Sequence, residues 1–225
     1  KAQHAGLPTI VVGNVIAGGA GKTPVTQAIV RHLKQRGWTP GIISRGYGRS
    51  TDDCRAVTPL SNPVDVGDEP LLLAQSTGVP VFVAPQRIDA ARALRAAHPD
   101  VDILVCDDGL QHTALARDVE ICVFHDGGVG NGWQLPAGPL REPWPRKVDA
   151  VLHTGPAPAG TPASQPTFAM QRQLAPYAVR ADGHHVPLSQ LRQQPVHAVA
   201  AVARPERFFA MLQAQGLQLA HAEAL

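Results

Sequence analysis

The sequence predicts an α/β fold in which a mostly parallel β-sheet is covered by helices on both faces. Short runs of Val, Ile and Leu alternate along the chain with segments that place apolar residues at helical spacing. Near-continuous apolar strands are typical of parallel sheets, because both faces of such strands are buried. The length of 225 residues and the 44% hydrophobic content suit one large domain, or one domain and part of a second.

The expected strands are apolar runs bounded by glycine, proline or polar residues, and they comprise residues 9–14, 41–44, 79–84, 101–108, 119–124 and 148–154. The expected helices comprise residues 24–36, 69–77 and 87–98. Gly37 ends the first of these helices, and Pro70 occupies the first turn of the second. Residues 50–66 are polar and contain prolines, so we expect a loop there.

The composition changes after residue 154. Residues 155–166 are rich in Pro, Gly, Ala and Ser and are predicted to be a linker or loop between a first domain, residues 1–154, and an incomplete C-terminal α/β portion, residues 167–225. Strands near 167–171 and 195–203 and a helix from about residue 204 are expected in this second portion.

Charge and cysteine content exclude several classes of protein. The net charge is +2 with Lys and Arg scattered singly, so no nucleic-acid surface is indicated. The three cysteines form no C-x-x-C pair, and Cys106 and Cys122 fall in apolar runs, which indicates buried thiols in a reducing compartment. The sequence has no apolar run of membrane-spanning length and no signal-peptide pattern. Both ends are consistent with truncation of a longer chain.

The stretch VIAGGAGKTPVTQAIVRHL (residues 15–33) has the pattern of a phosphate-binding loop between a strand and a helix. Glycines allow backbone N–H groups to surround phosphate oxygens, and the helix directs its positive end at the same anion. The lysine suits the β- and γ-phosphates, and the threonine hydroxyl suits Mg²⁺. The expected nucleotide-binding residues are Ile16, Ala17, Gly18, Gly19, Ala20, Gly21, Lys22 and Thr23.

Two departures bear on the subclass of this loop. Ile16 stands where the usual G-x-x-x-x-G-K-[ST] pattern begins with glycine, so Gly13 is expected to serve the turn. Ala17 replaces the lysine that partition ATPases carry before the paired glycines, and no N-K-x-D motif for guanine is present. Both features favour ATP and a role other than partition.

Two acidic pairs are expected near this loop. Asp107 and Asp108 end an apolar strand, where a Walker-B carboxylate would hold Mg²⁺; a solvated Asp-Asp-Gly turn is the alternative. Asp68 and Glu69 precede a helix, where they could cap it, or could accept a proton and hold metal during phosphoryl transfer. His112 follows the first pair closely and is the histidine best placed to line the site.

Two further segments contribute charged candidates. Arg45 and Arg49 follow a strand in SRGYGR and suit either an anionic substrate or a solvated turn. Residues 131–143 are irregular and offer Arg141 and Glu142 after a Pro-Ala-Gly-Pro turn; an ordered surface loop is the alternative interpretation.

The motifs together resemble the tetraacyldisaccharide 4'-kinases, the lipid A 4'-kinases of Gram-negative bacteria. The segments that carry the resemblance occur in family order, and they are VVGNVIAGGAGKTPV, SRGYGR, VGDEPLLLA, DDGLQH, RDVEICVF and GNGWQLPAGPLREP. The resemblance covers residues 8–153 strongly and extends weakly to 196–216. It implies an ATP-dependent kinase that transfers the γ-phosphoryl group to the 4'-hydroxyl of a lipid A disaccharide 1-phosphate precursor.

The resemblance also implies roles, cofactors and a location. The catalytic residues would be Asp68, as the base, with Lys22, Asp108 and His112. The metal ligands would be Thr23, Glu69, Asp107 and Glu142. Substrate or nucleotide phosphates would meet Arg45, Arg49, Arg87 and Arg141. The cofactors would be ATP and Mg²⁺, and the enzyme would work peripherally at the cytoplasmic face of the inner membrane, with no protein partner predicted.

This sequence departs from the family pattern at both ends. The family's apolar N-terminal helix and the later histidine that assists the base have no match here, and neither His197 nor His221 lies in the right motif. Two alternatives to an active kinase therefore stay open. One is a P-loop nucleotide-binding switch or metallochaperone GTPase, and the other is an inactive fragment that binds nucleotide.

Overall fold

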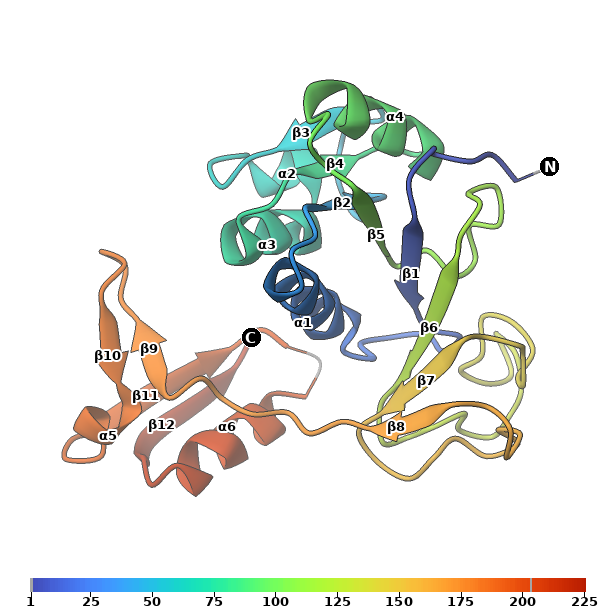
Figure 1. Cartoon of the computed structure of the whole chain (residues 1–225). Coiled ribbons are helices and arrows are strands. Elements are labelled where there is room, and N and C mark those ends of the chain that lie inside the picture. Colours follow the sequence, from blue (N-terminus) through green and yellow to red (C-terminus); the bar gives the residue numbers. More distant parts are fainter. Residues whose placement is uncertain (1, 203) are drawn as a thin grey trace. The chain divides into compact units, whose positions relative to one another are not determined.

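The computed structural model describes residues 2–202 and 204–225, which form two compact units. The first unit extends to Met170 and contains the phosphate-binding loop (Figure 1). The second unit comprises Gln171–Leu225. Each unit has its own hydrophobic core, and each is described separately.

The first unit is built on an eight-stranded sheet with the order β3-β4-β2-β5-β1-β6-β7-β8. Every neighbouring pair is parallel except β3 and β4, which confirms the predicted mostly parallel sheet. The strands are β1 (Thr9–Gly13), β2 (Pro40–Ser44), β3 (Arg55–Val57), β4 (Val81–Val83), β5 (Ile103–Asp107), β6 (Val119–Phe124), β7 (Ala150–His153) and β8 (Thr167–Ala169).

Helices cover both faces of this sheet, as predicted. They are α1 (Lys22–Gln35), α2 (Pro63–Val66), α3 (Asp68–Thr77) and α4 (Arg87–Ala97). Figure 1 shows α1 and α3 on one face and α4 on the other. The buried stripe of α4 consists of Ile88, Ala90, Ala91 and Leu94, and its small residues allow the helix to approach β2 and β4 closely. Gly37 has φ +86° just after α1, as expected for a residue that ends a helix.

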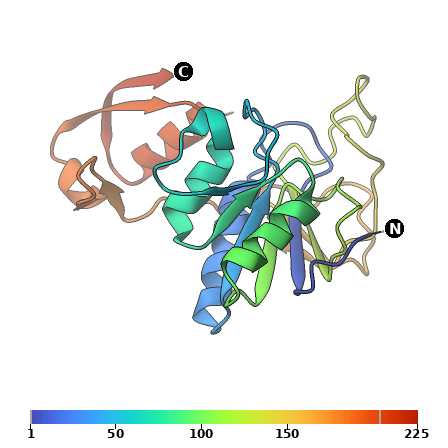
Figure 2. The ribbon, with the colours of Figure 1, turned by 90° about the horizontal axis from the view of Figure 1, so that it is seen from above.

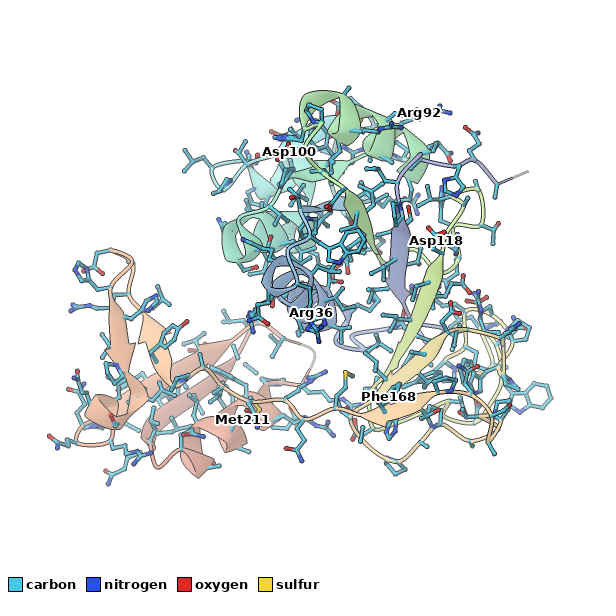
Figure 3. The ribbon with its side chains drawn as sticks, viewed as in Figure 1. Arg36, Arg92, Asp100, Asp118, Phe168 and Met211 are labelled. Carbon is cyan, nitrogen blue, oxygen red and sulfur yellow. The ribbon has the colours of Figure 1, made fainter. Side chains whose placement is uncertain are left out.

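One prediction about local structure was wrong, and the boundary between the units differs from the expected one. Residues 50–66 are not a continuous loop, because they contain the edge strand β3 and the short helix α2. The boundary between the units follows Met170 and not residue 166, because β8 pairs with β7 in the main sheet and Met170 N donates to His153 O at 2.7 Å. Residues 155–166 therefore connect two strands of one sheet, and Phe168 lies on the last of them (Figure 3).

The second unit contains two small sheets and two helices. Its elements are β9 (Tyr177–Val179), β10 (His185–Pro187), α5 (Leu188–Leu191), β11 (Pro195–Ala200), α6 (Pro205–Ala214) and β12 (Gln218–Ala224). Strands β9 and β10 are antiparallel, whereas β11 and β12 are parallel and are connected through α6. Leu188, Ala198, Leu212 and Leu217 form a small buried core.

Cys106 and Cys122 are buried, as their apolar context predicted, and burial raises the pKa of the first thiol to about 11 and of the second to about 12. Both are therefore protonated and unreactive near neutral pH. Among the helices that the structure describes, none has the length and apolar character needed to cross a bilayer.

Gly13 has a different role from the predicted one. It lies at the end of β1 without a positive φ, and a Cβ atom there would lie 2.7 Å from Leu110 Cγ and 3.0 Å from Leu110 N. The glycine therefore allows the segment after β5 to pass close to β1.

Gly13→Ala is expected to lower the free energy of unfolding by about 1–3 kcal/mol, because the added methyl group overpacks a fully buried site. Chemical denaturation of the wild type and the variant measures this difference. A change smaller than about 0.5 kcal/mol, which is typical of unconstrained surface positions, would contradict the close approach.

Candidate nucleotide-binding cleft

A cleft of about 940 Å³ opens at the carboxyl ends of β1, β2, β4 and β5. Figure 2 shows the loops that follow β1 (blue) and β2 (cyan) at the same edge of the sheet. In open parallel sheets this edge is where ligands bind. The sequence-predicted residues that line the cleft are Gly18, Gly19, Lys22, Arg45, Asp68, Glu69, Arg87, Asp108, His112 and Arg141.

The phosphate-binding loop runs from the end of β1 into the first turn of α1. Gly18 has φ +94° and Gly21 has φ +86°, and Gly21 forms the N-terminal cap of α1, so Lys22 is the first residue of the helix. Backbone conformations of this kind favour glycine. The side chains of Ile16 and Ala20 are fully buried, so these two residues anchor the loop and leave only their backbone for a ligand.

The irregular segment 131–143 holds the phosphate-binding loop from the other side. Ala17 N donates to Pro139 O at 2.7 Å, and Arg141 N donates to Val15 O at 2.7 Å. These hydrogen bonds place the Arg141 side chain at the mouth of the loop. The segment is therefore a wall of the site and not an independent surface loop.

Asp108 lies between two cations of the cleft. Its Oδ1 atom is 3.6 Å from Lys22 Nζ and 3.5 Å from Arg141 Nη1. Asp108, the residue directly after β5, has a positive φ of +49° although it is not a glycine. Such a backbone conformation is costly and is concentrated at functional sites. This carboxylate therefore offsets part of the positive charge of Lys22 and Arg141.

Asp107 lies beneath Asp108 and is completely buried. Its Oδ1 atom accepts a hydrogen bond of 2.7 Å from Thr26 Oγ1, whereas Oδ2 has no hydrogen-bond partner among the residues that the structure describes. Burial raises the pKa of this carboxyl to about 6, with Glu69 and Asp108 adding to the rise, while Thr26 and Lys22 oppose it. A buried oxygen without a partner fits an acceptor that awaits a cation or its water.

The pKa of Asp107 predicts a specific dependence of stability on pH. A carboxyl with a pKa of about 6 in the folded state and 3.8 unfolded stabilises the fold fully only below 3.8, and this contribution is lost as the pH rises through about 6. In the absence of metal, Asp107→Asn is therefore expected to raise the free energy of unfolding by about 1–3 kcal/mol at pH 7.5 and to change it little at pH 4. Denaturant titrations with a chelator at both pH values test this, and equal effects at both would contradict it.

Asp68 and Glu69 begin α3 and are exposed to the cleft. The alternative of a helix cap does not apply to their side chains, because the cap residue is Gly67 and no side-chain capping hydrogen bond is formed. Gly67 has φ +91°, and a Cβ atom on it would lie 3.1 Å from the backbone of Gly46. A Cβ atom on Gly46 would in turn lie 2.6 Å from Val66 O, so the two glycine turns interlock.

Hydrogen bonds extend this interlock. Ser50 N donates to Val64 O at 2.8 Å, and Thr51 Oγ1 donates to Asp65 O at 2.8 Å. The loop after β2, which carries Arg45, is therefore fixed to the segment that carries Asp68. In the sequence, the features that indicate this contact are the glycines of the motifs SRGYGR and VGDEP.

His112 and Arg87 also line the cleft. Partial burial lowers the pKa of the His112 imidazole, and the nearby Arg87, Arg117 and Arg45 lower it further, so the ring is neutral at neutral pH. Arg87 is buried and donates from Nη2 to Asp108 O at 3.0 Å.

The structure does not place all the predicted residues in the cleft. Arg49 was expected to face an anionic substrate, but it does not line the cleft. Its guanidinium donates to Asp53 O at 2.7 Å and to Thr51 Oγ1 at 3.4 Å, so its hydrogen bonds stabilise the loop to which it belongs. Glu142 lies behind the cleft wall, where its carboxylate accepts hydrogen bonds from Gln111 and Arg146. Thr23 is buried next to Lys22 and does not line the cleft.

The cleft also contains residues that the sequence analysis did not select. These are Ser44, Tyr47, Pro85, Gln86 and Gln111. Gln111 lies within DDGLQH and Tyr47 within SRGYGR, so the motifs themselves were a signal for these two. Pro85 and Gln86 follow β4, and their position became evident only from the order of strands in the sheet.

A glycine loop between β1 and α1, a lysine at the start of the helix and an acidic pair at the end of the neighbouring strand define a P-loop nucleotide-binding protein. The chain belongs to the Tetraacyldisaccharide-1-P 4'-kinase family, whose model matches residues 1–225. This confirms the resemblance seen in the motifs and separates the chain from the GTPase switches and metallochaperones.

Individual relatives agree with this assignment. The chain is 67% identical over 226 residues to a tetraacyldisaccharide 4'-kinase of Delftia acidovorans and 64% identical over 225 residues to one of Acidovorax sp. JS42. Each match covers 100% of this chain and 66% of the relative, so the chain spans just under two thirds of their length. The crystal structure of LpxK from Aquifex aeolicus in complex with ATP is similar, with a TM-score of 0.84 and 28% identity over 100% of this chain and 72% of that one.

Proposed function

We propose that this chain catalyses, or forms the nucleotide-binding part of an enzyme that catalyses, transfer of the γ-phosphoryl group of ATP to the 4'-hydroxyl of a tetraacyldisaccharide 1-phosphate in lipid A biosynthesis. The observation that carries the proposal is the convergence of Lys22, Asp68 and Asp108 on one cleft at the end of a P-loop. Phosphoryl transfer needs a cation at the phosphates and a carboxylate near the acceptor hydroxyl, and this cleft offers both.

ATP is the expected phosphoryl donor. The backbone of residues 16–21 and the Lys22 ammonium would surround its phosphates, and Arg141 and Arg87 lie where they can balance further negative charge. The comparison structure from Aquifex aeolicus is a complex with ATP, which supports this choice of nucleotide. Arg45, on the rim near Asp68, is our candidate for the 1-phosphate of the acceptor.

The residues present also fit Mg²⁺. Thr23 and Asp107 would hold it, with Glu69 nearby, and the partnerless Oδ2 atom of Asp107 is the observation that supports this set. Bound Mg²⁺ would supply positive charge that offsets the charge developing on the phosphate oxygens. No group of three or more His, Cys, Asp and Glu side chains suited to a metal occurs in the parts of the chain that the structure describes.

Asp68 is proposed as the base. Its carboxylate is exposed to the cleft, so an acceptor hydroxyl can approach it and transfer its proton as the new bond to the γ-phosphorus forms, while the bond from that phosphorus to the β,γ-bridging oxygen breaks and ADP leaves. Glu142 is proposed to act indirectly, since Gln111 and Arg146 occupy its oxygens. We propose a peripheral location at the cytoplasmic face of the inner membrane, because the acceptor of this reaction is a lipid.

The proposal is tested with radiolabelled ATP and tetraacyldisaccharide 1-phosphate. Transfer of label to the lipid, dependent on Lys22 and Asp68, is the expected result. Binding of ATP without transfer would favour the inactive nucleotide-binding fragment. Tighter binding of GTP than of ATP in calorimetry would contradict the kinase and favour a switch.

A further inference from the structure

Four charged side chains form a continuous ionic chain beneath the cleft wall, and none of them lines the cleft. Arg117 Nη1 lies 2.8 Å from Glu120 Oε1, and Arg146 Nη2 lies 2.6 Å from Glu120 Oε2. Arg146 Nη1 continues the chain to Glu142 Oε2 at 3.1 Å. The four side chains are only 12–24% exposed, so water screens these pairs far less than surface pairs.

Both ends of this ionic chain hold the loop that follows β5. At one end, Glu142 Oε1 accepts a hydrogen bond of 2.7 Å from Gln111 Nε2, which also donates to Asn14 O at 2.8 Å. Gln111 lines the cleft, so this end reaches the site directly.

At the other end, the Arg117 guanidinium donates to several backbone carbonyls of the same loop, namely those of Gly109, Leu110, His112 and Leu115. The loop carries Asp108 and His112 into the cleft. Arg117, at one end of the ionic chain, therefore contacts the backbone of the loop, and Glu142, at the other end, contacts the Gln111 side chain.

Glu120 connects the two arginines of the ionic chain and is held in place by the main sheet. It lies on β6, opposite Val11 of β1, and its backbone N–H donates to Asp149 Oδ2 at 2.7 Å. Arg146 and Glu142, by contrast, lie in the irregular segment between β6 and β7. One carboxylate on a rigid strand thus uses each of its oxygens for a different arginine, and the two arginines lead to the two sides of the loop.

We infer that Glu120 is a positioning residue that fixes Gln111 and the loop of residues 108–112 through Arg117 and through Arg146 and Glu142. The inference deepens the proposed function, on which its kinetic test rests. A glutamine at position 120 would keep the shape of the side chain but would have a single acceptor oxygen, so one arginine would face an N–H₂ group. The loop would then lose one of its two attachments.

The first test observes Gln111 directly and needs no lipid. In the ¹⁵N-labelled protein, the side-chain amide of Gln111 is identified by its absence in Gln111→Ala. Because it donates to two acceptors, its protons should exchange slowly with solvent, and in Glu120→Gln they should exchange about tenfold faster or more. Unchanged exchange would overturn the inference whether or not the protein transfers phosphate.

The second test is a double-mutant cycle on kcat for phosphoryl transfer. Glu120→Gln alone is expected to lower kcat about 10- to 100-fold, as loss of an outer partner or a small displacement of the site typically does. In the Gln111→Ala background the same change should lower kcat clearly less than it does in the wild type, because the part of the effect that acts through Gln111 is already missing and only the part through Arg117 is left.

The matched control is Asp89→Asn, which removes one charge from the exposed pair of Asp89 and Arg92 on α4; Figure 3 shows Arg92 on the outer side of this helix. The effect of Asp89→Asn on kcat should be the same in the wild type and in the Gln111→Ala background. Equal effects of Glu120→Gln with and without Gln111, accompanied only by a lower melting temperature, would show a structural role and overturn the inference. Absence of transfer in the wild type would reject the proposed function and leave the amide exchange to decide the inference.

Discussion

Asp68→Asn is expected to lower kcat about 10²–10⁴-fold while leaving the affinity for ATP nearly unchanged. The carboxylate lies at the start of α3 and faces the cleft, where it can accept the proton of the attacking hydroxyl, and an amide cannot do so. Steady-state assays with varied ATP and acceptor measure kcat and KM separately, and calorimetry measures ATP binding.

Asp65→Asn provides the matched control for this prediction. Asp65 lies in the same segment and pairs with Arg55 at 4.0 Å, but it does not line the cleft. Its replacement should leave kcat within about twofold of the wild type, as is usual for surface pairs. Wild-type turnover in Asp68→Asn would remove the proposed base.

Lys22→Met should lower kcat/KM for ATP about 10²–10³-fold. The Lys22 side chain is buried at the first turn of α1, lines the cleft and lies 3.6 Å from Asp108, so at the proposed phosphate site its charge would be screened only weakly by water. Part of the effect is expected in ATP binding, because Arg87 and Arg141 would then have to balance the charge of the phosphates without the lysine.

Lys34→Met on the same helix is the comparison for this variant. Lys34 is exposed and donates to Thr77 O at 3.3 Å, far along α1 from the phosphate-binding loop. Lys34→Met should therefore leave kcat/KM for ATP unchanged. Equal losses in the two lysine variants would indicate damage to α1 and not a role for Lys22 at the phosphates.

Much of the architecture could be predicted from the sequence because its strongest signals are local. The apolar runs that became β1, β5 and β6 are buried strands, and the glycine loop lies between β1 and α1 as its spacing indicates. Strands of one parallel sheet end at one edge, so residues that follow different strands were correctly expected to meet. Lys22 and Asp108, which are 3.6 Å apart, illustrate this reasoning, although their roles in catalysis stay predictions.

The errors arose where pairing between distant segments decides the structure. Strand β8 has three residues and an exposed phenylalanine, so only its pairing with β7 shows that it belongs to the sheet. Arg49 looked like an anion-binding residue, yet its partners are the carbonyl and hydroxyl groups of its own loop. Glu142 was expected at the metal, and the arginine that draws it behind the cleft wall lies in a segment without a recognisable pattern.

The interlock of Gly46 with Gly67 has a consequence for protein engineering. A side chain on either glycine would collide with the backbone of the other turn. Substitutions in segment 44–51 and in segment 62–68 therefore have to be compatible with each other, although the segments are separated along the chain. Randomising only the first segment is therefore expected to yield many variants that fail to fold. Chimeras that exchange both segments together between relatives should retain the fold.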